Sequence, residues 1–99
     1  MFVNMISKGG DADNKLTEEE VIELTQVQAS AYLNMSVSYY MLKEYAKSRD
    51  RATSSLELQK TTKGFYRRAV SKKMLTDYEG ACQDLKEAIK LDTSDPNDF

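Results

Sequence analysis

The hydrophobic residues of this chain recur at steps of three and four positions, the period of an amphipathic helix. Thr17 followed by Glu20 forms a capping-box pattern, which places the start of a first helix at Thr17. We expect this helix to continue to about residue 42. Its predicted buried face consists of Val21, Leu24, Val27, Ala31, Met35, Tyr39 and Leu42.

Three shorter helices are predicted after the first one. The second is weakly apolar and carries Tyr45, Ala52, Leu56 and Leu58. The third begins at Thr61 or Thr62, either of which can cap it, and carries Phe65, Ala69, Val70, Met74 and Leu75. The fourth has the most regular period, formed by Tyr78, Ala81, Cys82, Leu85, Ala88, Ile89 and Leu91. Because almost nothing between residues 17 and 91 breaks a helix, the sequence predicts an all-α fold.

The two predicted helix pairs repeat each other with an offset of 33 residues. The aligned pairs are Ser36 with Ala69, Leu42 with Leu75, Tyr45 with Tyr78, Ser48 with Ala81, Ala52 with Leu85 and Ser55 with Ala88. Small residues at the first, fourth and sixth of these positions let two antiparallel helices approach closely. The repeated tyrosine, which follows the turn, is expected to fill the space between neighbouring pairs.

With this spacing, residues 29–92 resemble the tetratricopeptide repeat (TPR) family. The motifs that carry the resemblance are Tyr39-x5-Tyr45-x2-Ser48, residues 63–69 (Lys-Gly-Phe-Tyr-Arg-Arg-Ala) and Leu75-x2-Tyr78-x2-Ala81-x6-Ala88. They are most similar to the repeats that follow the isomerase domain in large immunophilins of the FKBP and cyclophilin types. The resemblance implies an antiparallel helix-hairpin solenoid coiled into a right-handed superhelix.

This chain departs from the TPR pattern in several places. Its repeat has 33 residues where 34 is usual, and Lys60 and Thr93 stand where the repeats usually end in proline. Ser48 and Ser55 occupy positions where alanine is typical.

The expected organisation is two hairpins between two partial elements. Residues 17–58 and 61–91 form the hairpins, residues 1–16 are the tail of an earlier repeat helix plus a loop, and residues 92–99 begin a truncated capping helix. About three repeats are needed for a stable stack. We therefore expect a homodimer or an exchange of helices at high concentration.

Composition narrows the classes of function. The chain has 99 residues, a net charge of −2, no histidine and one cysteine. These counts exclude imidazole catalysis, Cys/His zinc sites and an internal disulfide, and they are typical of a reduced, cytoplasmic protein. Cys82 lies on the predicted apolar face of the fourth helix, so we expect a buried, inert thiol.

Neither the overall charge nor the tyrosine-rich and glutamate-rich stretches indicate a partner. The weakly acidic chain is not attracted as a whole to nucleic acid or an anionic membrane. The tyrosine-rich stretch at residues 32–45 is interpreted as packing rather than base stacking. The glutamates of residues 18–23 suit a helix N-terminus better than a metal site. The sequence predicts no metal, no cofactor and no catalytic set.

The candidate chemistry lies on the third helix and on the first helix before it. Lys63 and Arg67 are four residues apart and share one side of a helix, and Asn34 lies at a matching height on the first helix. Lys60 is a supporting basic residue in a stretch, residues 60–73, that has six basic residues and no acidic one. One interpretation is that this stretch is a solvated helix face and that Asn34 forms a hydrogen bond between two helices. Alternatively, the basic residues attract an acidic peptide.

The TPR resemblance favours the acidic peptide. In co-chaperones of this family, residues like Asn34, Lys63 and Arg67 form a carboxylate clamp for the C-terminal Glu-Glu-Val-Asp tail of heat-shock protein 90 or 70. The clamp has two further members on an earlier repeat, so we expect weak binding by this chain. Any peptidyl-prolyl isomerase activity would lie in another domain. The alternative function is a TPR scaffold that binds another protein, or itself, without a clamp.

Overall fold

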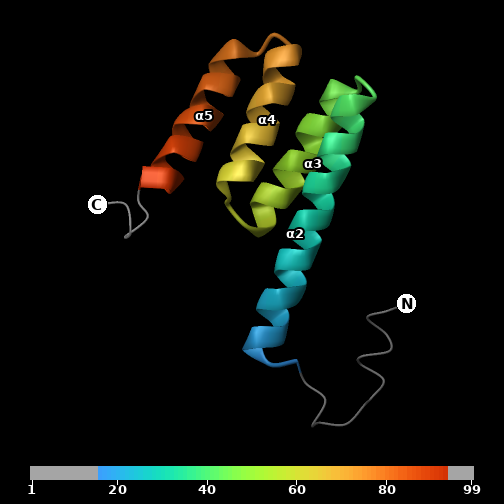
Figure 1. Cartoon of the computed structure of the whole chain (residues 1–99), viewed down its shortest axis with the longest axis vertical. Helices are drawn as coiled ribbons and strands as arrows, with labels where there is room; N and C mark the ends of the chain where they lie inside the picture. The colour runs from blue at the N-terminus through green and yellow to red at the C-terminus, as the bar shows by residue number, and fades with distance from the viewer. Residues whose placement is uncertain (1–15, 94–99) are drawn as a thin grey trace.

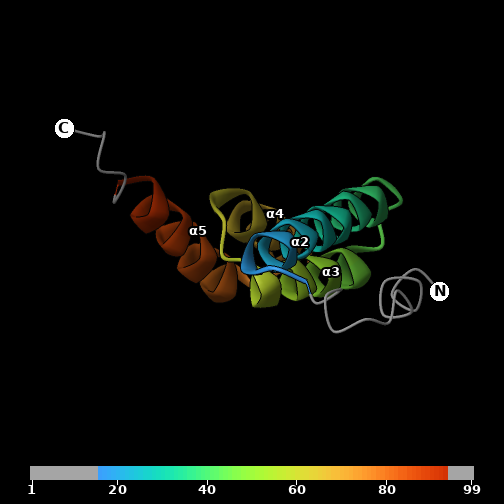
Figure 2. The same ribbon diagram turned by 90° about the horizontal axis from the view of Figure 1, so that it is seen from below.

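A computed structural model describes residues 16–93, which form four α-helices (Figure 1). The helices are α2 (Glu18–Met41), α3 (Tyr45–Leu58), α4 (Thr62–Met74) and α5 (Tyr78–Thr93). Helix α2 packs on α3, α3 on α4 and α4 on α5, with a smaller contact between α2 and α4. A second view shows α3 below α2, with α4 next to both and α5 on the far side of α4 (Figure 2). No strand occurs within residues 16–93, and the all-α helix-hairpin fold is confirmed.

Two predicted elements lie mostly outside the described residues. The expected tail of an earlier repeat and its loop span residues 1–16, and only Leu16 of them is described. The expected capping helix spans residues 92–99, and its first two residues, Asp92 and Thr93, are the last residues of α5.

Side-chain caps fix where three of the helices begin. The Thr17 hydroxyl accepts the Glu20 N–H at 3.1 Å, and the Glu20 carboxylate accepts the Thr17 N–H at 2.9 Å, which confirms the capping box. Of the two candidate caps for α4, the structure uses Thr61, whose hydroxyl accepts a backbone N–H at 2.9 Å. Asp77 plays the same part at α5, at 3.0 Å. These bonds satisfy N–H groups that have no partner inside the helix.

The turns of the two hairpins repeat each other in detail. Lys43 and Thr76, which are 33 positions apart, have left-handed backbones with φ of 64° and 65°. The residue after each donates its N–H to a carbonyl five residues earlier, at 2.9 and 2.8 Å respectively. This pattern ends a helix with a left-handed residue and turns the chain back on itself. The internal repeat therefore extends to the backbone conformation.

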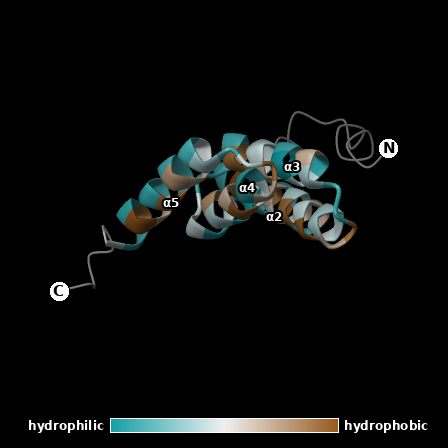
Figure 3. Cartoon of the chain, turned by 90° about the horizontal axis from the view of Figure 1, so that it is seen from above, coloured by the Kyte–Doolittle hydropathy of each residue, from teal (hydrophilic) through white to brown (hydrophobic). Residues whose placement is uncertain are grey.

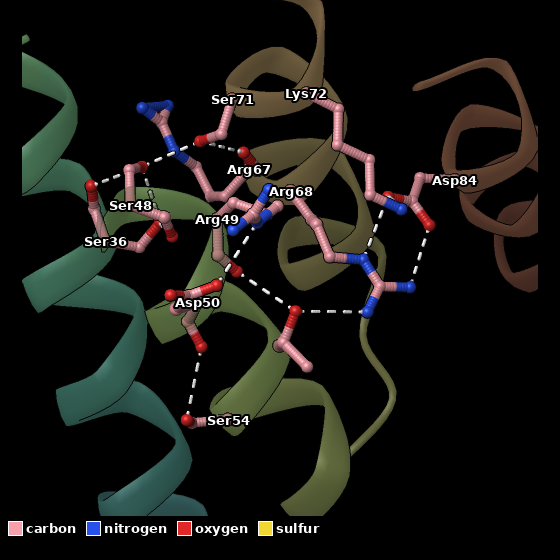
Figure 4. Close-up of polar contacts among 11 residues, drawn as sticks. Ser36, Ser48, Arg49, Asp50, Ser54, Arg67, Arg68, Ser71, Lys72 and Asp84 are labelled. Carbon is pink, nitrogen blue, oxygen red and sulfur yellow. Dashed lines mark hydrogen bonds and ion pairs between the residues drawn. The ribbon is translucent and has the colours of Figure 1, made fainter. Parts of the chain in front are cut away.

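Small residues lie where the helices approach each other most closely. The six aligned small positions are all buried: Ser36, Ser48, Ser55, Ala69, Ala81 and Ala88. The Ser36 and Ser48 hydroxyls each donate to the other residue's carbonyl at 2.8 Å, and the Ser48 oxygen lies 2.7 Å from the Ser71 hydroxyl (Figure 4). These hydroxyls join α2, α3 and α4 within the core and satisfy one another there. The predicted close approach is confirmed.

The predicted buried face of α2 is wrong for most of its residues. Val21, Leu24, Val27, Met35 and Leu42 are exposed, and Val27 keeps 66% of its surface. Helix α2 buries the opposite positions instead, Ala29 and Ser36. Periodicity shows which face of a helix is apolar, but the face is buried only where another element covers it. No element among residues 16–93 covers this one.

The prediction for Cys82 is also wrong. Its thiol is exposed on the outer side of α5, as are Leu85 and Ile89. The buried side of α5 is formed by Ala81, Asp84 and Ala88. These three residues face α4, and the larger apolar residues of α5 face outward.

The left-handed turns lead to a prediction about stability. A β-branched residue in this conformation costs about 1–2 kcal/mol, which glycine avoids. We expect Thr76→Gly to raise the free energy of unfolding by about 1 kcal/mol, after allowing for the greater freedom of glycine in the unfolded chain. Urea denaturation followed by circular dichroism measures the change. Lys43→Gly, at the equivalent turn, should give a smaller gain because lysine is not β-branched. A loss of stability in Thr76→Gly would contradict this account of the turn.

Candidate anion-binding site

The six basic residues of the stretch 60–73 do not act together in the structure. Arg68 and Lys72 extend from α4 toward α5, where both reach the carboxylate of Asp84 (Figure 4). Arg67 lies on the other side of α4, toward α2. The basic residues of α4 are therefore divided between two faces of the helix.

Asp84 of α5 forms ion pairs with two cations of α4, Arg68 and Lys72. The Arg68 guanidinium donates to both carboxylate oxygens, at 2.9 and 2.8 Å, and the Lys72 ammonium lies 3.1 Å from one of them. Arg68 also donates to the Thr53 hydroxyl of α3 at 3.3 Å. The Asp84 side chain keeps only 4% of its surface exposed. A planar guanidinium gripping both carboxylate oxygens is a strong, directional ion pair.

The environment of Asp84 lowers the pKa of its carboxyl group below the ordinary value of 3.8. Burial alone would raise this pKa, since it disfavours the charged form. Hydrogen bonds from Arg68 and Lys72, together with their positive charges, outweigh that effect. The carboxylate therefore stays ionised at neutral pH and keeps both cations on the α5 side.

The predicted site residues on the other face of α4 share one pocket. Asn34, Lys63 and Arg67 all line a cavity of about 430 Å³ between α2 and α4. Its other walls are formed by Ser30, Leu33, Val37 and Tyr66. Among residues 16–93, no carboxylate forms an ion pair with Lys63 or Arg67. Two cations and one amide therefore face a common space, and nothing described there neutralises their charge.

Arg67 is held in place by aromatic rings. Its guanidinium carbon lies 5.5 Å from the ring centre of Tyr40 and 5.9 Å from that of Tyr66, distances at which a cation is attracted to a ring face. The Nε atom of Arg67 is buried and has no hydrogen-bond partner in the described structure. A buried donor without a partner is costly.

Lys60, the predicted supporting residue, is not brought to this pocket. It is exposed in the loop between α3 and α4 and does not belong to the lining.

Sequence reasoning also missed Asp84, although a signal for it was present. Asp84 is an acidic residue between Ala81 and Ala88 on the side of α5 that carries them, and Arg68 and Lys72 are one helical turn apart.

Residues 16–93 do not form the other kinds of site considered for this chain, a metal site or a membrane span. Within residues 16–93 there is no group of three or more His, Cys, Asp or Glu side chains placed to hold a metal ion. No helix in this range is both long enough and apolar enough to cross a membrane.

Comparison with known proteins finds a partial match to a phosphatase. Over 90 residues the chain is 32% identical to serine/threonine-protein phosphatase 5 of Rattus norvegicus and to that of Mus musculus. The match covers 89% of this chain and 18% of each phosphatase. No family model and no solved structure matches the chain.

The match agrees with the repeat, the paired turns and the buried small residues. The chain contains a TPR-like helical region. Because it spans less than a fifth of the length of these relatives, the match says nothing about catalysis by this chain. Both relatives are phosphatases, so the comparison does not support the immunophilin type.

The ion pairs of Asp84 lead to a prediction about stability and pH. Asp84→Asn leaves Arg68 and Lys72 beside a neutral amide, and breaking a buried pair costs about 3 kcal/mol at pH 7. A carboxyl group with a lowered pKa stabilises the fold above its unfolded pKa, about 3.9, and this contribution is lost as pH falls through the folded value. The difference between wild type and variant should therefore be constant above pH ~5 and shrink below pH ~4.

Urea denaturation at a series of pH values measures this difference. Asp50→Asn is the matched control, because Asp50 pairs with Arg49 at the surface. Surface pairs contribute about 0–1 kcal/mol, so the control should change little. An Asp84→Asn variant as stable as the wild type at neutral pH would contradict the role given to this carboxylate.

Proposed function

We propose that this chain is a protein-interaction module that binds the free, acidic C-terminus of a partner protein in the pocket between α2 and α4. The observation that carries the proposal is the pair Lys63 and Arg67, two cations without acidic partners in the described structure, lining one cavity with Asn34. Tyr40 and Tyr66 hold the Arg67 guanidinium at this pocket.

The chemistry of a peptide end fits this set of groups. A main-chain carboxylate beside an aspartate side chain carries two negative charges, and each oxygen accepts hydrogen bonds. The Arg67 guanidinium supplies parallel donors, Lys63 supplies a point charge, and the Asn34 amide can donate as well as accept. All three residues belong to helices, so little conformational freedom is lost on binding. The apolar lining residues Leu33 and Val37 suit an apolar side chain beside the acidic end.

The proposed partner is the acidic C-terminal tail of heat-shock protein 90 or 70. The support comes from the sequence resemblance to chaperone-binding TPR regions, in which residues like Asn34, Lys63 and Arg67 hold a Glu-Glu-Val-Asp tail. The immunophilin type rests on the same resemblance. In this proposal the chain acts as a co-chaperone adaptor and has no catalytic role.

A direct test is calorimetric titration with a peptide ending in Met-Glu-Glu-Val-Asp. We expect weak binding, since three side chains make the contacts. Each charge-assisted bond to a carboxylate contributes about 1.5–3 kcal/mol, so Lys63→Ala or Arg67→Ala should each weaken binding by about tenfold or more. Amidation of the peptide end should do the same, because it removes a charge and an acceptor oxygen.

The matched control is Lys73→Ala. Lys73 is an exposed cation on α4 that does not line the pocket. This variant removes the same charge from the same helix and should leave affinity nearly unchanged. Equal losses in Lys73→Ala and Arg67→Ala would indicate general attraction by positive charge and would contradict a defined pocket. If neither amidation of the peptide nor the two pocket variants changed the affinity, the result would favour a scaffold without a clamp.

A further inference from the structure

Exposed apolar residues form two stripes, one on each of the outermost helices, α2 and α5. Helix α2 stands at one end and α5 at the other, and each packs against described helices on its inner side (Figure 1). The stripe on α2 consists of Val21, Leu24, Val27, Ala31, Met35 and Leu42. The stripe on α5 consists of Tyr78, Cys82, Leu85 and Ile89. Coloured by hydropathy, both end helices show apolar segments (Figure 3).

The 33-residue repeat indicates what would cover the stripe on α5. Leu85 and Ile89 are equivalent to Ala52 and Leu56 of α3. Those two residues are buried, to 0% and 6% exposure, whereas Ile89 keeps 61% of its surface. Helix α3 packs on α4. In α3 this face is covered by α4, the first helix of the next hairpin. The equivalent face of α5 is its exposed outer face.

The stripe on α2 is the other half of the same kind of contact. In α4, Gly64 lies so close to α3 that a Cβ atom there would be 2.7 Å from the Leu56 side chain, and Phe65 shares a core cluster with Leu56. The position equivalent to Gly64 is Ala31, which lies on the exposed α2 stripe. The face of α4 that contacts α3 therefore has an equivalent on α2, and on α2 this face is exposed.

We propose that copies of this chain stack head to tail, with the outer face of α5 in one copy packed on the outer face of α2 in the next. The contact continues the established interface between α3 and α4, with Ile89 in the position of Leu56 and Ala31 in that of Gly64. The tip of the Ile89 side chain shifts to make room for the Ala31 Cβ. A second copy is the occupant because one chain carries both halves of the contact. Lys63 and Arg67 take no part in it.

The charges at these faces are compatible with such a contact. Between Leu24 and Leu42, α2 has no charged residue, so this part of its face brings no unpaired charge into the interface. Glu20 and Glu23 lie beside the N-terminal end of the stripe. The α5 face has Lys86 at its edge, equivalent to the half-buried Thr53. A lysine there can lay its apolar stem along Met35 and keep its ammonium in water.

A head-to-tail contact differs from a closed dimer in its consequences. The two surfaces are different, so each added copy leaves a free α5 face at one end and a free α2 face at the other. Assembly therefore continues beyond the dimer as concentration rises.

Two substitutions at exposed positions separate the faces. Ile89→Lys blocks the α5 face, and Met35→Lys blocks the α2 face. Gln83→Lys is the matched control, because Gln83 is exposed on α5 outside the stripe. Each protein is studied by sedimentation velocity under reducing conditions from micromolar to near-millimolar concentration, with circular dichroism to check helix content.

The wild type and Gln83→Lys should show a mass that rises with concentration past that of a dimer. Each blocked variant should remain a monomer alone, since it lacks one of the two surfaces. An equimolar mixture of the two blocked variants should form a one-to-one dimer, a twofold rise in mass, and nothing larger. This recovery on mixing also shows that both variants are folded.

Three results would overturn the proposal. A wild type that stays monomeric at every concentration excludes stacking. Homodimers of Ile89→Lys or of Met35→Lys alone would show a contact between like faces. Two blocked variants that stay monomeric when mixed, although the wild type assembles, would place the contact elsewhere.

Discussion

The contact of Asp84 with Arg68 and Lys72 determines which way α4 faces. The carboxylate is almost fully buried, and a buried carboxylate is tolerated only when its charge is balanced. Successive residues of a helix are rotated by about 100°, so residues four apart share one side and neighbouring residues do not. Once Arg68 and Lys72 face α5, Arg67 and Lys63 must face away from it. The free cations of the pocket therefore depend on an ion pair that takes no part in binding.

The close approach of the helices brings a second element to the same pocket. The buried hydroxyls of Ser36, Ser48 and Ser71 take little space and satisfy their own hydrogen bonds inside the core. Their small size lets α2, α3 and α4 pack tightly, so Tyr40 of α2 reaches the guanidinium of Arg67. Asn34, also on α2, faces the same cavity. Packing within the core thus sets the positions of the groups at the surface.

Much of the fold could be predicted from the sequence because local patterns determine it. Capping residues, the helical period and the alignment of Ser48 with Ala81 depend on neighbours a few positions away. The exposed stripe of α2 could not be predicted, because an apolar pattern does not show whether an element is present to cover it. The division of the basic stretch was missed for a related reason, since it depends on Asp84 in another helix.

The same limit applies to the candidate site. Helical spacing alone placed Lys63 with Arg67, because both belong to one helix. The arrangement of Tyr40 beside Arg67 and the absence of Lys60 from the pocket depend on how separate helices pack. The exposure of Cys82 follows from the same packing, since the smaller residues of α5 turn toward α4.

The most direct test of this account is a nuclear magnetic resonance titration that follows the arginine Nε–H and lysine side-chain signals while an acidic peptide with a free C-terminus is added. The account predicts that the signals of Arg67 and Lys63 shift with peptide concentration and saturate. The signals of Arg68 and Lys72 should stay in place, because Asp84 already holds them. Equal shifts in all four residues would contradict the division of α4 into a structural face and a binding face.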